Sequence, residues 1–417
     1  MIHTLNKIGF YLLLVLLSAI PFHFKASELG IPVYYREIIS SGFILLLFIN
    51  LLNLKPFPLK IRKEVFFLIL FPFLLSLSAL YDPMESLYND EVSIYDITNV
   101  EGNLDPRLYV LRNSLLYLPM VFYFALRGIS IEEINKIAIL SIIVAPFSVL
   151  FYLINILESK ELSVFLLGEM SEKSGIAIEY NSYVPYLSFP VISGIYLLLG
   201  KHNSLTKLLT IIAISFVTIF IILSTSRQTL MFIIISCYLF IVLNRFEKNY
   251  KKIILPSIAI LIGLMIYQIL LSGYAIDHRI VEKYTINALS LDRVKILHDS
   301  FLVLQPFEYL TGAGLTSVLV SGPHNDYMRW MQRVGIFFMI ISFIPFYSAA
   351  FKCFLKRNRN NNDLVTLYLG LAIFFIIYHS FFGYPREDAY QAVWSFLGIT
   401  MWLAYTKQKS NIRLLKE

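Results

Sequence analysis

The stretch INKIAILSIIVAPFSVLFYLINIL, residues 134–157, decides the fold class, because it holds 24 residues with a single charged side chain, Lys136. A helix needs about 17–25 mainly apolar residues to cross a membrane. Similar apolar runs recur from residue 8 to residue 406 with short breaks between them. They predict an all-α, polytopic membrane protein with about 12 transmembrane helices. We expect residues 1–417 to form one transmembrane domain, without internal repeats.

The expected spans share long apolar runs bounded by charged or turn residues. They lie near residues 8–24, 37–54, 64–81, 108–126, 134–157, 179–199, 205–225, 228–244, 253–272, 330–351, 364–382 and 388–406. The first run is interpreted as a membrane helix and not as a cleaved signal peptide, because no small-x-small site closes it.

Composition excludes a soluble protein. Hydrophobic residues make up 57% of the chain and charged residues 15%, with a mean hydropathy of +0.68, whereas soluble domains carry about 25% charge. The basic residues behind the net charge of +7 lie mainly in the loops between spans, as expected of a membrane protein, so we expect no nucleic-acid partner. Cys237 and Cys353 lie in or beside apolar runs without metal-ligand spacing, and we interpret both as small hydrophobic residues.

The connecting loops alternate in charge. Basic residues gather in 55–63, 201–207, 245–252, 352–359 and 407–416, and acidic residues gather in 82–105 and 158–172. Cytoplasmic loops retain Lys and Arg, so the basic set is expected inside, with both termini cytoplasmic. Segments 82–107, 158–178 and 273–329 are long and lie outside. We therefore expect the chemistry outside, with short helices such as Ser290–Leu304 in the loop between the ninth and tenth spans.

Common catalytic motifs are absent from the sequence. There is no phosphate-binding GxxxxGK[ST], no HExxH, no GxSxG and no DxD. Mechanisms that depend on ATP, zinc, a serine hydrolase triad or a nucleotide sugar therefore lack support, and no metal or cofactor is expected.

The most informative stretch runs from Leu310 to Gly335. Gly312 and Gly314 permit tight turns, and Pro323 stops any helix that enters from the loop. Asn325 or Asp326 can cap the helix that follows, which holds His324 at the outer mouth of the bundle. Histidine can accept a proton near neutral pH, so His324 is a candidate base. The alternative is that His324 only caps or packs.

Arginines close to span ends are candidate anion ligands. Ser226-Arg227 opens a span on the outside, and Arg293 follows Asp292 at the start of the expected loop helix. The guanidinium fork of arginine suits pyrophosphate oxygens. Snorkelling at the interface, or a solvated loop charge, is the alternative for each. Further candidates at outer ends or in the last loop are Arg36, Arg112, Arg279, Arg329 and Arg333; the last two could line a cavity or contact lipid headgroups.

These residues give the chain a resemblance to the O-antigen polymerase and ligase superfamily of bacterial membrane glycosyltransferases. The resemblance rests on Ser226-Arg227, on Arg293 followed by Gly312-x-Gly314, and mainly on His324-Asn325-x-Tyr327 with Gly335 eight residues later. It covers roughly residues 224–340, and topology extends it loosely over the whole chain.

The resemblance implies a metal-independent glycosyltransferase of the bacterial inner membrane with its active site facing the periplasm. It would move a glycan from undecaprenyl pyrophosphate to an acceptor hydroxyl, with residues 273–329 as a catalytic loop. By this resemblance, Arg227 and Arg293 would bind the pyrophosphate. His324 would act as base towards the acceptor hydroxyl, or would orient it. Asn325, Tyr327, Ser226 and the other listed arginines would bind substrate. A separate chain-length regulator, or co-polymerase, is a possible partner that the family suggests.

Three functions remain open at the level of sequence. An O-antigen polymerase, which uses a second lipid-linked repeat unit as acceptor, is favoured by the His324–Tyr327 element and the long last outside loop. An O-antigen ligase would use lipid A-core instead. A lipid-linked oligosaccharide flippase would belong to another class, but flippases should show two similar halves and charges at mid-membrane.

Overall fold

The computed structural model describes the chain in separate segments. They cover residues 2–19, 35–53, 63–80, 111, 115–158, 184–223, 227–243, 302, 304–314, 325–355, 363–381 and 393–403. All regular structure within these segments is helical. Every predicted span other than 253–272 overlaps a helix, and 253–272 lies outside the described residues, as does nearly all of Ser290–Leu304.

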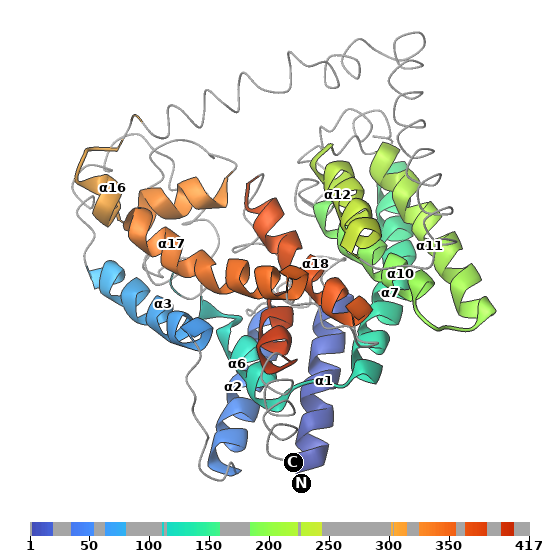
Figure 1. The fold of residues 1–417 in the computed structure, drawn as a ribbon, viewed down its shortest axis with the longest axis horizontal. Coiled ribbons are helices and arrows are strands. Elements are labelled where there is room, and N and C mark those ends of the chain that lie inside the picture. Colours follow the sequence, from blue (N-terminus) through green and yellow to red (C-terminus); the bar gives the residue numbers. More distant parts are fainter. Residues whose placement is uncertain are drawn as a thin grey trace.

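The named helices follow the chain in the order that Figure 1 shows. They are α1 (Ile2–Ala19), α2 (Tyr35–Asn53), α3 (Lys63–Leu80), α6 (Leu118–Arg127), α7 (Ile131–Glu158), α10 (Ser188–Leu199), α11 (Ser204–Leu223), α12 (Arg227–Leu243), α16 (Glu308–Thr311), α17 (Asp326–Leu355) and α18 (Asp363–His379). Residues 395–403 are also helical.

Within the described segments, three helices are long and apolar enough to cross a membrane. They cover Ile131–Ile154, Ser204–Ile222 and Asp326–Phe354, and several shorter apolar helices accompany them. Large apolar side chains also remain exposed along the outward faces of α2, α3, α7 and α11, including Phe48, Phe73, Phe147 and Leu205. Such wide apolar exposure is costly in water. The described residues therefore have the features of a helical membrane protein.

Helix α18 occupies the centre of the bundle. Between Leu367 and Ile377 nearly every side chain is buried, as expected of a helix that is apolar on all sides. It packs against α17, α10 and α12, while α3 and α16 pack against α17 (Figure 1). A second core joins α7, α10, α11 and α12 through residues such as Val149, Val191 and Phe220. The burial of Cys237 and Cys353, both free thiols, confirms their interpretation as core residues.

Helix α17 is bent at Gly335. This glycine has φ 79° and ψ 169°, a conformation that side chains with a Cβ rarely adopt, and it divides the helix into an approach of nine residues and a longer apolar segment. The predicted span began near residue 330; the structure begins the helix at Asp326 and places Gly335 within it.

Candidate functional site

The start of α17 is capped by Asn325. Its side-chain Oδ1 accepts a hydrogen bond from the amide of Met328 at 3.1 Å. This is an N-cap contact, since it satisfies one of the amides that a helix start leaves without a partner. The prediction that Asn325 or Asp326 caps this helix is confirmed. His324 directly precedes this cap in the sequence but lies outside the described residues.

The same residues join α17 to the end of α18. The amide of Asp326 donates to the carbonyl of Ser380 at 2.7 Å, and the Asn325 side-chain amide donates to the carbonyl of Phe381 at 3.4 Å. The Tyr327 hydroxyl donates to the carbonyl of Ile377 at 3.0 Å. We call residues 325–327 together with 377–381 the α17–α18 junction. It supplies donors for carbonyls that a helix C-terminus leaves without partners.

Tyr327 is held by further contacts. Its hydroxyl lies 2.8 Å from the hydroxyl of Tyr347, and its ring lies 4.2 Å from the ring of Phe343 and 4.6 Å from that of Phe381, measured between centroids. Asn325 and Tyr327 were predicted to bind substrate. In this structure their polar groups connect helices, which fixes the position of the chain immediately after residue 324.

Helix α12 reaches the junction from the other side of α18. The ring of Phe232 lies 5.3 Å from that of His379 and 5.6 Å from that of Phe375. Phe232 is five residues from Arg227, the first residue of α12. The starts of α12 and α17, about 100 residues apart in the sequence, therefore both lie against the last turns of α18.

His379 is a buried polar residue that the sequence analysis did not select. It is 2% exposed and lies among the rings of Phe232, Phe375 and Tyr378. The signal was present, because His379 is an ionisable residue inside a predicted span, where such residues are costly and often functional. Asp326 at the facing end of α17 is also fully buried.

The loop that leads into the site is fastened to the bend of α17. Gly312 ends α16 with φ 79°, and the next two amides, those of Ala313 and Gly314, donate to the carbonyls of Gln332 and Arg333 at 2.7 Å and 3.2 Å. Because the helix bends at Gly335, the carbonyls of Gln332 and Arg333 no longer point at helix amides one turn ahead. The amides of Ala313 and Gly314 donate the hydrogen bonds to these carbonyls instead. We call this contact the glycine clasp.

Two of the three glycines at the clasp, Gly312 and Gly335, are required sterically. A Cβ on Gly335 would clash with the carbonyl of Leu310, and a Cβ on Gly312 would clash with the carbonyl of Arg333. Backbone packing therefore explains Gly312 and Gly335, and Gly314 adopts a positive φ of 113° that favours glycine.

The arginines of α17 differ in exposure. Arg333 is 1% exposed, which argues against contact with lipid headgroups, whereas Arg329 is partly buried. Arg227 is the first residue of α12, and Arg36 is the second residue of α2. The side chains of both lie outside the described residues. Ser226, Arg112, Arg279 and Arg293 also lie outside them. Within the described residues no cluster of His, Cys, Asp or Glu could hold a metal ion.

Comparisons of the chain with protein-family models, with curated proteins and with solved structures gave no match.

Proposed function

We propose that this chain is an O-antigen polymerase of the bacterial inner membrane. It would transfer an undecaprenyl-pyrophosphate-linked glycan onto a sugar hydroxyl of a second lipid-linked repeat unit at the periplasmic face. The observation that supports the proposal is the meeting of the starts of α12 and α17 at the end of α18. These starts carry the two elements of the resemblance, Ser226-Arg227 and His324-Asn325.

The proposed reaction needs charge stabilisation and one proton acceptor. The acceptor hydroxyl oxygen forms a bond to the anomeric carbon of the donor, and the bond from that carbon to the pyrophosphate oxygen breaks. Negative charge then grows on the leaving pyrophosphate, which Arg227 and Arg293 would stabilise. The hydroxyl proton passes to His324 as the new glycosidic bond forms. Undecaprenyl pyrophosphate is released, and no metal or cofactor takes part.

Buried polar residues at and near the junction support this proposal. Asp326 and His379 at the junction, and Arg333 two turns farther along α17, are each at most 2% exposed although they lie within or at the ends of apolar helices. Such residues usually face the bundle interior and mark substrate pathways. A pyrophosphate head group linked to a lipid tail would need a polar end of this kind beside an apolar surface.

Purified protein in proteoliposomes tests the proposal. A synthetic undecaprenyl-pyrophosphate repeat unit is added, and the lipid-linked products are separated by chain length. We expect products of two or more repeat units joined by new glycosidic bonds. Movement of the intact repeat unit across the vesicle membrane without new bonds would instead identify a flippase.

A gene deletion separates polymerase from ligase. Loss of a polymerase leaves lipopolysaccharide with a single repeat unit, since ligation continues. Loss of a ligase leaves bare core and accumulated lipid-linked glycan, and this second outcome would contradict the proposal.

A further inference from the structure

Gln228 has a buried side-chain oxygen at the start of α12. Its Oε1 atom is screened from solvent and has no hydrogen-bond partner within the described part of the chain. A buried polar atom without a partner is costly, and the large majority of such atoms in folded proteins are paired with protein groups or ordered water. Gln228 therefore lies where a hydrogen-bond donor from a ligand would be favourable.

The position of Gln228 links it to the α17–α18 junction. It lies one helical turn before Phe232 and so shares the face of α12 that packs against His379 and Phe375. The carbonyl of Ser380, next to His379, accepts the amide hydrogen bond of Asp326. Phe232 of α12 and the backbone amide of Asp326 at the start of α17 thus contact the last turns of α18 from two different helices.

We propose that Gln228 is a glycan-binding residue, and that its side-chain amide hydrogen-bonds a sugar hydroxyl of the lipid-linked substrate. This inference rests on the proposed function. A hydroxyl can both donate and accept, so it satisfies the amide in either orientation. Gln228 would therefore recognise the glycan, while the arginines hold the pyrophosphate.

The test compares two lipids and two variants of the full chain in detergent micelles. Undecaprenyl pyrophosphate with one repeat unit and undecaprenyl pyrophosphate without glycan are titrated, and the ratio of their dissociation constants is measured. Gln228→Leu removes the amide at similar volume. Ser236→Ala is the matched control, because the buried Oγ of Ser236 in α12 also has no hydrogen-bond partner within the described residues, but Ser236 lies two turns farther from the junction.

We expect Gln228→Leu to weaken binding of the glycan-bearing lipid by about twofold to tenfold, the range for one lost neutral hydrogen bond. Its affinity for the glycan-free lipid should stay unchanged, and Ser236→Ala should alter neither. An unchanged ratio, or an equal loss for both lipids, overturns the role of Gln228 while the proposed function stands. A wild-type chain that binds neither lipid overturns the proposed function, and this inference with it.

Discussion

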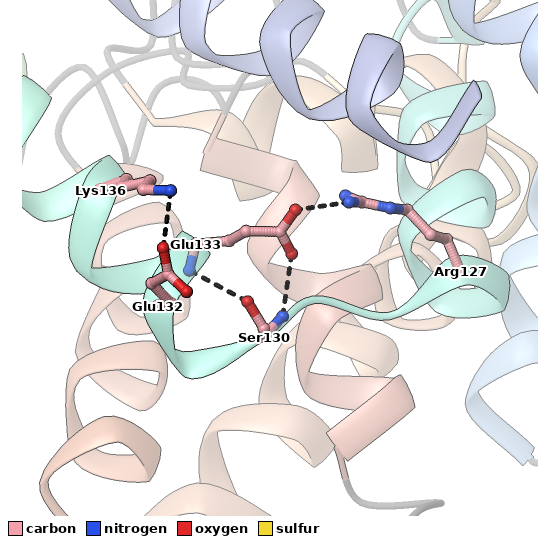
Figure 2. A network of polar contacts seen from close by, with 5 residues as sticks. All are labelled: Arg127, Ser130, Glu132, Glu133 and Lys136. Atoms are coloured by element: carbon pink, nitrogen blue, oxygen red, sulfur yellow. Dashed lines mark hydrogen bonds and ion pairs between the residues drawn. The ribbon is translucent and has the colours of Figure 1, made fainter. Parts of the chain in front are cut away.

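The α6–α7 turn and the α17–α18 junction both join helix ends that carry buried charge, but they are built from different contacts. At the α6–α7 turn, Arg127 pairs with Glu133 at 2.5 Å, and Glu133 exchanges hydrogen bonds with Ser130 (Figure 2). This is a capping box with an added ion pair. All hydrogen-bond and ion-pair partners at this turn are side chains or amides within seven residues of one another.

The α17–α18 junction depends on distant partners. Residues 325–327 bond to main-chain carbonyls about 50 residues farther along the chain. The contrast teaches where function can be expected. A turn whose charges pair locally contributes mainly stability, although one Arg127 nitrogen, Nη1, is buried there without a hydrogen-bond partner among the described residues. A junction whose polar side chains fix two helix ends can hold neighbouring residues in position for a substrate.

The largest effect is expected at His324, directly before the junction. His324→Ala should lower glycan transfer by about 10²–10⁴-fold, because a positioned base contributes that much. The measurement is polymer formation by purified protein, with protein level and melting temperature followed in parallel. His202→Ala, at the turn between α10 and α11, is the control and should keep full transfer. Wild-type products from the His324 variant would remove this residue from catalysis.

The next effect concerns Arg227, the first residue of α12. If its guanidinium contacts pyrophosphate through two hydrogen bonds, Arg227→Lys should lose nearly as much activity as Arg227→Ala. We expect a loss of about 10²–10³-fold in turnover for each, the cost of one missing donor to developing negative charge. Full activity in the lysine variant would show that a point charge is sufficient at this position.

The glycine clasp should control stability more than the rate of transfer. Gly335→Ala places a Cβ in a positive-φ conformation and against the carbonyl of Leu310. We expect a loss of about 3 kcal/mol in the free energy of unfolding, at the upper end for strained backbone.

Gly42→Ala is the control for the clasp. A Cβ on Gly42, inside α2, would meet only the flexible end of Leu12 at 3.2 Å. The stability of this variant should remain equal or rise slightly, since alanine favours helix. Equal stability of the Gly335 and Gly42 variants would show that the clasp does not depend on glycine.

Much of the helical pattern could be predicted from the sequence, because apolar length and loop charge are local signals. The N-cap at Asn325 was also predictable, since capping depends on residues three apart. The Ser130-x-x-Glu133 spacing of the capping box was equally readable from the sequence, and the two acids beside it pair with Arg127 and Lys136.

Contacts between distant residues could not be predicted in this way. Nothing in the sequence near Tyr327 indicates that its hydroxyl bonds the carbonyl of Ile377, or that Phe232 packs on His379. The bend at Gly335 was missed for a related reason. Glycine is tolerated within apolar helices, so its role is visible only when the loop amides of Ala313 and Gly314 are placed against it. The roles of His324, Arg227 and Arg293 remain predictions.

The smallest effects are expected for substitutions at the α6–α7 turn. Their effects on unfolding free energy and on glycan transfer test whether this turn is purely structural. Glu133→Gln keeps the capping box, because glutamine also serves at this position, but it removes the charge beside Arg127, whose side chain is 7% exposed. We expect a loss of about 2 kcal/mol in unfolding free energy, below the ~3–5 kcal/mol of a fully buried pair because Glu133 is partly exposed.

Glu132→Gln is the matched control for this turn, since Glu132 pairs with Lys136 at 2.8 Å with its side chain 78% exposed. Exposed pairs contribute little, so its stability should be unchanged in thermal unfolding. Glycan transfer should equal that of the wild type in both variants. Reduced transfer by Glu133→Gln at unchanged stability would contradict the comparison, because a charge matched locally would then be acting on the substrate.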